Sequence, residues 1–116
     1  KVPPVNNTKP PTAIRFPGGE ERGIKYWKDV LVETAEWLAR NGVLTAARCP
    51  IGRGHERHIV HSQSVHPNGR DFITPKTLSN GLILETNISA KQARADAVFL
   101  LQQLGQDPAG IELRLP

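Results

Sequence analysis

Residues 82–105 read LILETNISAKQARADAVFLLQQLG, and this stretch predicts a strand that leads directly into a helix. Its first residues are mostly aliphatic, which is typical of a buried strand. Ser89 and Gln92 then form a Ser-x-x-Gln capping box, a pattern that starts helices. We therefore expect a helix over about 90–104, and Gly105 ends it because glycine readily adopts a left-handed conformation.

A second helix is expected earlier in the chain, over about 24–41. The Asn41-Gly42 pair supplies its C-terminal stop. Apolar residues recur there at steps of three and four, as they do on one face of a helix. These residues are Trp27, Val30, Leu31, Thr34, Ala35 and Leu38.

Extended segments account for most of the remaining chain. Strands are expected at 57–61, 71–74, 82–86 and 111–115, and the His-Pro-Asn-Gly turn at 66–69 would pair the first two. The order is helix, two or three strands, helix, strand. This order predicts an α+β fold in two layers, with two helices packed on a three- or four-stranded, mainly antiparallel sheet.

The chain of 116 residues has the length of one domain, and its start differs from the rest. Residues 1–19 read KVPPVNNTKPPTAIRFPGG, where five prolines oppose both helix and sheet. We expect a Pro-rich linker over 1–19 and a single α+β domain over 20–116. Such a linker, and a chain that starts at Lys1 and contains no Met, predict an upstream domain of the same polypeptide.

The composition predicts where the protein is located and which partners it has. Cys49 is the single cysteine, so no internal disulfide is possible, and a reducing, cytoplasmic location is expected. No apolar run approaches the roughly 20 residues that cross a bilayer, so we expect no membrane partner. No cofactor is expected, and oligomer formation is possible.

All four histidines lie in one segment, GHERHIVHSQSVH, as His55, His58, His61 and His66. Histidines beside acids can form a metal site or an acid–base site, but this spacing matches no recognised motif. Side chains alternate along a strand, which would place His58 and His61 on opposite faces unless a bulge intervened. We therefore assign no metal ligand and no catalytic residue.

The same region is the most basic part of the chain, which has a net charge of +4. Residues 48–76 contain five Arg and Lys residues but only two acids, and this excess of positive charge favours contact with phosphates. The predicted nucleic-acid-binding residues, with DNA favoured over RNA, are Arg48, Arg53, Arg57, His58, His61, Arg70 and Lys76.

Three segments give the chain a family resemblance. They are YWKDVL at 26–31, GLILETNISA at 81–90 and LLQQLG at 100–105. In this pattern, over about Trp27 to Leu115, the chain resembles small C-terminal modules of bacterial restriction-type and phage-defence proteins. The resemblance implies an accessory role and identifies no catalytic residue.

We therefore predict a non-catalytic, nucleic-acid-binding accessory domain of a bacterial restriction or antiviral defence protein. One alternative is a protein-interaction or dimerisation module, in which a free sheet edge such as 111–115 would pair with a partner. Another is a small metal nuclease that depends on the histidines. The sequence leaves these alternatives open.

Overall fold

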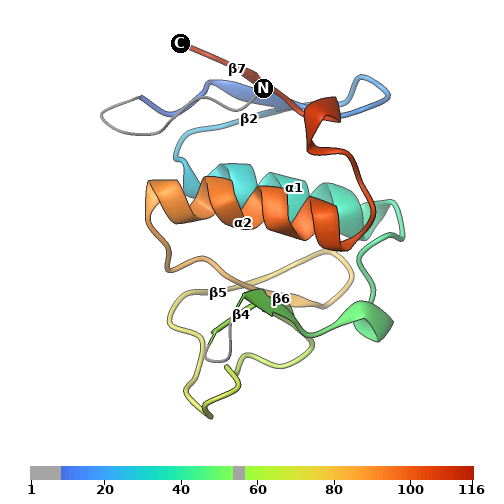
Figure 1. Ribbon diagram of the computed structural model, residues 1–116. Helices are drawn as coiled ribbons and strands as arrows, with labels where there is room; N and C mark the ends of the chain where they lie inside the picture. The colour runs from blue at the N-terminus through green and yellow to red at the C-terminus, as the bar shows by residue number, and fades with distance from the viewer. Residues whose placement is uncertain (1–8, 54–56) are drawn as a thin grey trace.

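The computed structural model describes residues 9–53 and 57–116, and it places a layer of helices between two small antiparallel sheets (Figure 1). The first sheet has the order β2-β1-β7, and the second has the order β3-β4-β6-β5. This arrangement confirms the α+β class, with the helices packed on a four-stranded antiparallel sheet, but the expectation of two layers is wrong because a second sheet covers the other side of the helices (Figure 1). The elements are β1 (Ala13–Arg15), β2 (Glu21–Gly23), α1 (Lys28–Arg40), β3 (Ile51–Arg53), β4 (Arg57–His61), β5 (Pro75–Thr77), β6 (Ile83–Glu85), α2 (Ala90–Gln103) and β7 (Glu112–Arg114), with single 3₁₀ turns at Ala46–Arg48 and Pro108–Gly110.

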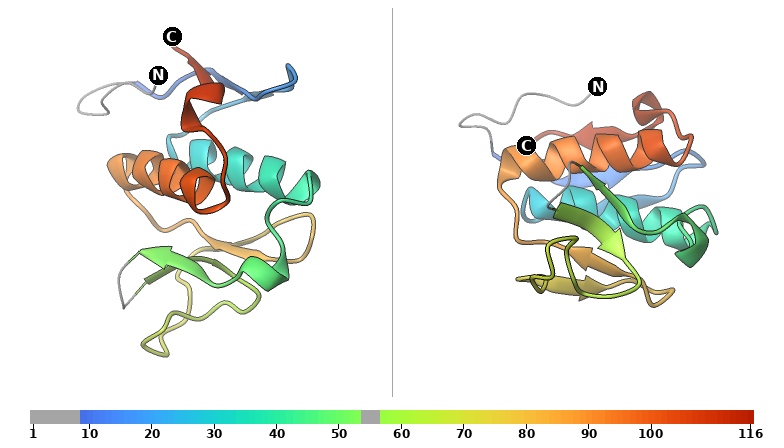
Figure 2. Two further views of the ribbon diagram at one scale, coloured as in Figure 1. Left: turned by 45° about the vertical axis from the view of Figure 1, so that its right-hand side comes forward. Right: turned by 60° about the horizontal axis from the view of Figure 1, so that its bottom comes forward.

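Both helices occur where the sequence predicts them, and they run side by side in the same direction (Figures 1 and 2). The capping box of α2 forms as expected, because the Ser89 hydroxyl accepts a hydrogen bond from the Gln92 N–H at 3.1 Å. The start of α1 uses a different device. The Asp29 carboxylate accepts the N–H groups of Lys25 and Tyr26, which fixes the segment before α1 to the first turn of the helix.

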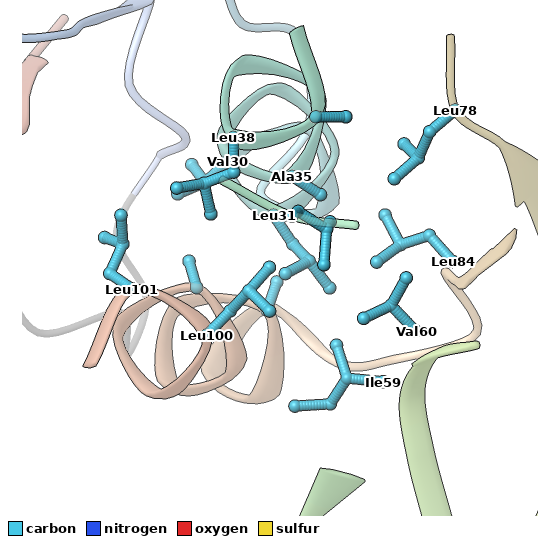
Figure 3. Close-up of a cluster of buried hydrophobic side chains, with 14 of the residues drawn as sticks. Val30, Leu31, Ala35, Leu38, Ile59, Val60, Leu78, Leu84, Leu100 and Leu101 are labelled. Carbon is cyan, nitrogen blue, oxygen red and sulfur yellow. The ribbon is translucent and has the colours of Figure 1, made fainter. Parts of the chain in front are cut away.

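The core lies on both sides of the helical layer. Toward the four-stranded sheet, Leu31 and Leu100 pack near Val60 and Leu84 (Figure 3), and all four side chains are fully buried. Toward the three-stranded sheet, Ile14 is fully buried in the same cluster. A helix that is covered on two sides must bury a broad arc, and the buried residues of α1 span about half of its circumference at 100° per residue. These are Val30, Leu31, Thr34, Ala35, Leu38 and Ala39.

The three-stranded sheet was not predicted, and it alters the expected domain boundary. β1 is its central strand and pairs with both β2 and β7, so the two ends of the folded chain meet there. Ile14 and Phe16 are buried, and the Phe16 ring stacks on Trp37 with centroids 5.0 Å apart. The second half of the predicted linker therefore belongs to the fold, while residues 1–8 lie outside the described residues.

One expected strand is wrong. Residues 71–74 do not pair with β4, whose partners are β3 and β6. The His66–Gly69 turn does form, and a single bridge between Val65 and Asp71 closes it. Residues 62–74 instead form a loop on the side of the four-stranded sheet that faces away from the helices (Figures 1 and 2).

Candidate functional site

A bulge in β4 decides which side chains share a face of the four-stranded sheet. Ile51 pairs with Val60, but the next residue, Gly52, pairs with His58, which leaves Ile59 as an extra residue. Ile59 and Val60 are consecutive and both fully buried, which a regular alternating strand does not allow. The bulge therefore reverses the alternation of side chains between the two ends of β4.

This reversal places His58 and His61 on the same, outer face of the sheet. Their ring centroids lie 5.0 Å apart with an angle of 81° between the ring planes, and both side chains are partly exposed. A regular strand would have separated them, as the sequence predicts. The structure contains the bulge that brings the two rings to the same face.

His66 and Glu85 complete this group, which we call the histidine face: His58, His61, His66 and Glu85. His66 comes from the loop, and its ring centroid lies 6.5 Å from that of His58. Its Nε2 lies 3.2 Å from a carboxylate oxygen of Glu85, which belongs to β6. Phe72 supports the ring from the loop side, with centroids 4.7 Å apart. The loop is thereby fixed against the outer face.

The Glu85 carboxylate anchors this arrangement. It is 2% exposed, and it accepts the backbone N–H groups of Ile73, Thr74 and Asn87 at 2.8, 2.9 and 3.1 Å. Burial raises the pKa of Glu85, but these three N–H donors and His66 outweigh it, so the pKa lies below its usual range. Glu85 is therefore an ionised, fully engaged structural acid.

The contacts of each histidine assign its neutral tautomer. His66 Nδ1 accepts the backbone N–H of His58 at 3.0 Å, so its proton is on Nε2 and is donated to Glu85. His58 Nδ1 lies 3.1 Å from the Val65 carbonyl, which can only accept, so Nδ1 carries the proton. His61 Nδ1 accepts the Ser62 N–H at 2.9 Å, which leaves its proton on Nε2.

The same contacts bear on metal binding. Both ring nitrogens of His66 are engaged, so this residue is not available as a ligand. Over residues 9–53 and 57–116, no group of three or more His, Cys, Asp and Glu side chains is arranged to hold a metal ion. His55 and Glu56, which the sequence places beside β4, lie outside the described residues.

The predicted basic surface is divided between several places. Arg57 precedes the bulge and points to the helix side, where its guanidinium lies 2.8 Å from Asp96 of α2. Arg53 approaches the same carboxylate at 3.4 Å, and the Gln92 amide donates to it at 2.7 Å. Asp96 is fully buried and lies near both guanidinium groups. A single carboxylate can neutralise only one of the two positive charges, so one is left in excess.

The other three predicted basic residues lie apart from this pair. Arg48 donates a hydrogen bond to the Gln103 carbonyl at the end of α2. Lys76 pairs with Leu84, a core residue, so it lies on the helix side of the sheet and lines a cavity with Glu33 and Glu36. Arg70 alone belongs to the loop over the histidine face, where its carbonyl accepts the His66 N–H.

Sequence reasoning missed Glu85 and Asp96, although each carries a visible signal. Asp96 lies three residues after Ala93 and four before Leu100, within the apolar stripe of α2. Glu85 follows the aliphatic residues of β6 and precedes a helix cap. An acid in a buried position requires partners, which here are cations and backbone N–H groups.

Two further features bear on the expected partners, namely the length of the helices and the position of β7 in its sheet. No helix within the described ranges is long and apolar enough to cross a membrane. The strand expected to pair with a partner forms β7, which is an edge strand with β1 on one side, and the interaction alternative stays a prediction.

No family model, no curated protein and no solved structure matches this chain. The resemblance to restriction-type and phage-defence modules therefore stays a prediction as well. The histidine face is the feature on which a proposed function rests.

Proposed function

We propose that the protein binds single-stranded nucleic acid on the histidine face, beside the loop that carries Arg70. The observation that supports this most is the bulge, which gathers two partly exposed histidines on one open face. Imidazole rings stack on bases and donate hydrogen bonds to phosphates, and an exposed arginine contributes charge. Single-stranded nucleic acid has unstacked bases that can reach such partly exposed rings.

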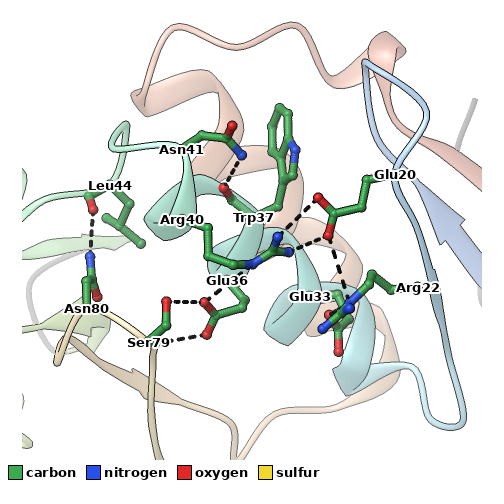
Figure 4. A network of polar contacts seen from close by, with 10 residues as sticks. All are labelled: Glu20, Arg22, Glu33, Glu36, Trp37, Arg40, Asn41, Leu44, Ser79 and Asn80. Carbon is green, nitrogen blue, oxygen red and sulfur yellow. Dashed lines mark hydrogen bonds and ion pairs between the residues drawn. The ribbon is translucent and has the colours of Figure 1, made fainter.

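The distribution of acids supports the same face. Several acids near α1 and the three-stranded sheet form ion pairs with arginines: Glu20 contacts Arg40 at 2.6 Å, and Glu33 contacts Arg22 at 3.3 Å (Figure 4). Glu21 pairs similarly with Arg114 at 2.8 Å. These ion pairs neutralise the arginines that take part in them, whereas the acid of the histidine face, Glu85, is buried.

Arg70 contributes an exposed positive charge to the loop, and its backbone carbonyl accepts the His66 N–H. Its side chain has no ion pair within residues 9–53 and 57–116. The neighbouring Asp71 is the exposed acid of this loop. Because this guanidinium forms no ion pair with another described residue, no such pair has to break when it binds a phosphate.

Fluorescence anisotropy with a labelled single-stranded DNA and its 2′-O-methyl RNA counterpart tests the proposal. We expect binding that weakens as salt rises, because bound phosphates release counterions. Arg70→Ala should weaken binding and reduce the salt slope by about one. Arg15→Ala, which removes the same charge from β1 in the opposite sheet, is the matched control.

Two results would contradict the proposal. The first is the absence of binding at low salt. The second is an equal loss of affinity in Arg70→Ala and Arg15→Ala, which would show that net charge, and not this face, attracts the nucleic acid.

A further inference from the structure

We propose that His58 and His61 cleave single-stranded RNA without a metal ion, by promoting attack of a ribose 2′-hydroxyl on the adjacent phosphate. This inference rests on the proposed binding of nucleic acid at the histidine face. It adds a reaction, assigns a role to each of the two histidines, and restricts the cleaved substrate to RNA.

The His58 and His61 rings carry opposite tautomers. Because His58 Nδ1 donates to the Val65 carbonyl, its Nε2 presents a lone pair. Because His61 Nδ1 accepts the Ser62 N–H, its Nε2 presents a proton. One ring can therefore accept a proton while its neighbour donates a hydrogen bond, and backbone groups of the fold hold both in these states.

Neither of these two Nε2 atoms has a partner within the described part of the chain. His66, by contrast, has both nitrogens engaged and serves to position the other rings through the backbone of His58. Burial and the neighbouring His58 lower the pKa of His61, which favours its neutral form. The Nε2 atoms of both rings are thus unoccupied by other described residues and can bind a ligand.

Contacts of Glu85 and the register of β4 hold the two rings in place. Three backbone N–H groups and His66 bind the Glu85 carboxylate, which holds the loop onto β6. The bulge fixes the spacing of His58 and His61 within one strand. Catalytic groups held by strands keep their geometry better than groups on free loops, and good positioning accounts for much of a rate enhancement.

The reaction balances without a metal or redox partner. His58 Nε2 accepts the proton of the 2′-hydroxyl, and the 2′-oxygen forms a bond to phosphorus. His61 Nε2–H donates a hydrogen bond to a non-bridging phosphate oxygen as negative charge develops there. The bond from phosphorus to the 5′-oxygen then breaks, and that oxygen takes a proton from water. The products are a 2′,3′-cyclic phosphate and a 5′-hydroxyl, and His58 returns its proton to solvent.

The nucleophile defines the substrate. DNA lacks the 2′-hydroxyl, so it can occupy the same face but cannot undergo this reaction. Base pairing would also hold the 2′-oxygen of a duplex away from in-line attack, which favours single strands. The reaction therefore separates binding, which both polymers can show, from cleavage, which only RNA can show.

The test incubates the full chain with single-stranded RNA of random sequence in the presence of EDTA and identifies the product ends. We expect cleavage to 2′,3′-cyclic phosphate and 5′-hydroxyl ends. His58→Ala should reduce the rate by roughly 10²-fold or more, as the loss of a general base does. His61→Ala should reduce it by about 10²-fold, as the loss of a charge-stabilising donor does. Arg15→Ala, purified identically, should retain the activity.

Anisotropy with 2′-O-methyl RNA and circular dichroism accompany each variant, so a loss of cleavage is not confused with a loss of binding or folding. Folded protein that binds RNA but does not cleave it would overturn the proposed reaction and leave the proposed function intact. Protein that neither binds nor cleaves would overturn both. Cleavage that EDTA abolishes, or that survives both histidine substitutions, would overturn the roles of His58 and His61.

Discussion

At the scale of single residues, Glu85 shows how a buried charge can organise a surface. Its carboxylate takes the N–H groups of Ile73 and Thr74, which a strand partner would otherwise have taken. This contact explains why residues 71–74 form a loop although their sequence favours a strand. Strand propensity reports a local preference, and a charged acceptor contributed by another strand outweighs it here.

We predict that Glu85→Gln lowers the free energy of unfolding by about 2 kcal/mol at neutral pH, because hydrogen bonds to a charged acceptor are stronger than those to an amide. The folded state lowers the pKa of Glu85 from its ordinary 4.5. Its contribution is therefore fully present above about pH 4.5 and is lost as the pH falls through the folded pKa. Urea unfolding, followed by tryptophan fluorescence between neutral and acidic pH, measures this effect.

Glu112→Gln is the matched control, since Glu112 is exposed on β7 and the substitution is chemically identical. It should change the stability by less than about 0.5 kcal/mol at every pH. A constant difference between wild type and Glu85→Gln across the whole pH range would contradict the assigned role of the ionised carboxylate.

At the scale of elements, the bulge in β4 determines the chemistry of the histidine face. The segment His58-Ile59-Val60-His61 contains its signal, since two adjacent aliphatic residues between polar ones break the alternation of a half-buried strand. The strand itself was predictable, but the bulge depends on a partner strand that sequence reasoning did not identify. Without the bulge, the sequence does not predict that the His58 and His61 side chains share one face.

Gly52 is the residue in β3 that permits the bulge. A Cβ atom at this position would meet the carbonyl oxygen of Arg57 and come within 3.0 Å of the His58 Cα. We predict that Gly52→Ala costs about 1–3 kcal/mol, as overpacking does, because backbone atoms cannot move aside as a flexible side chain can. Urea unfolding measures the cost, and histidine NMR signals report the displacement of His58.

Gly23 in β2 provides the control for this substitution. A Cβ atom there meets nothing within 4 Å, so Gly23→Ala should be neutral or slightly stabilising. Unchanged His58 signals and unchanged stability in Gly52→Ala would contradict the close approach of β3 to the bulge.

At the scale of the whole molecule, the helical layer needs both sheets. α1 and α2 were predictable from periodicity and from the Ser89 cap, since these signals lie within one segment. The three-stranded sheet was not, because β1 lies in a Pro-rich stretch and its partner β7 is far away in sequence. Pro11 and Pro17 flank β1 but lie outside it, so they remove no donor from its pairing with β2 and β7.

Ile14 tests whether β1 is part of the core or an appended segment. Its side chain is fully buried against the helical layer, whereas Ile73 is 72% exposed in the loop of the histidine face. Ile14→Ala should therefore lower the free energy of unfolding by about 3 kcal/mol, within the range of core truncations. Ile73→Ala removes the same atoms and should cost less than about 0.5 kcal/mol. If the two variants lost equal stability, β1 would act as the linker that its prolines indicate, and the helices would depend on the four-stranded sheet alone.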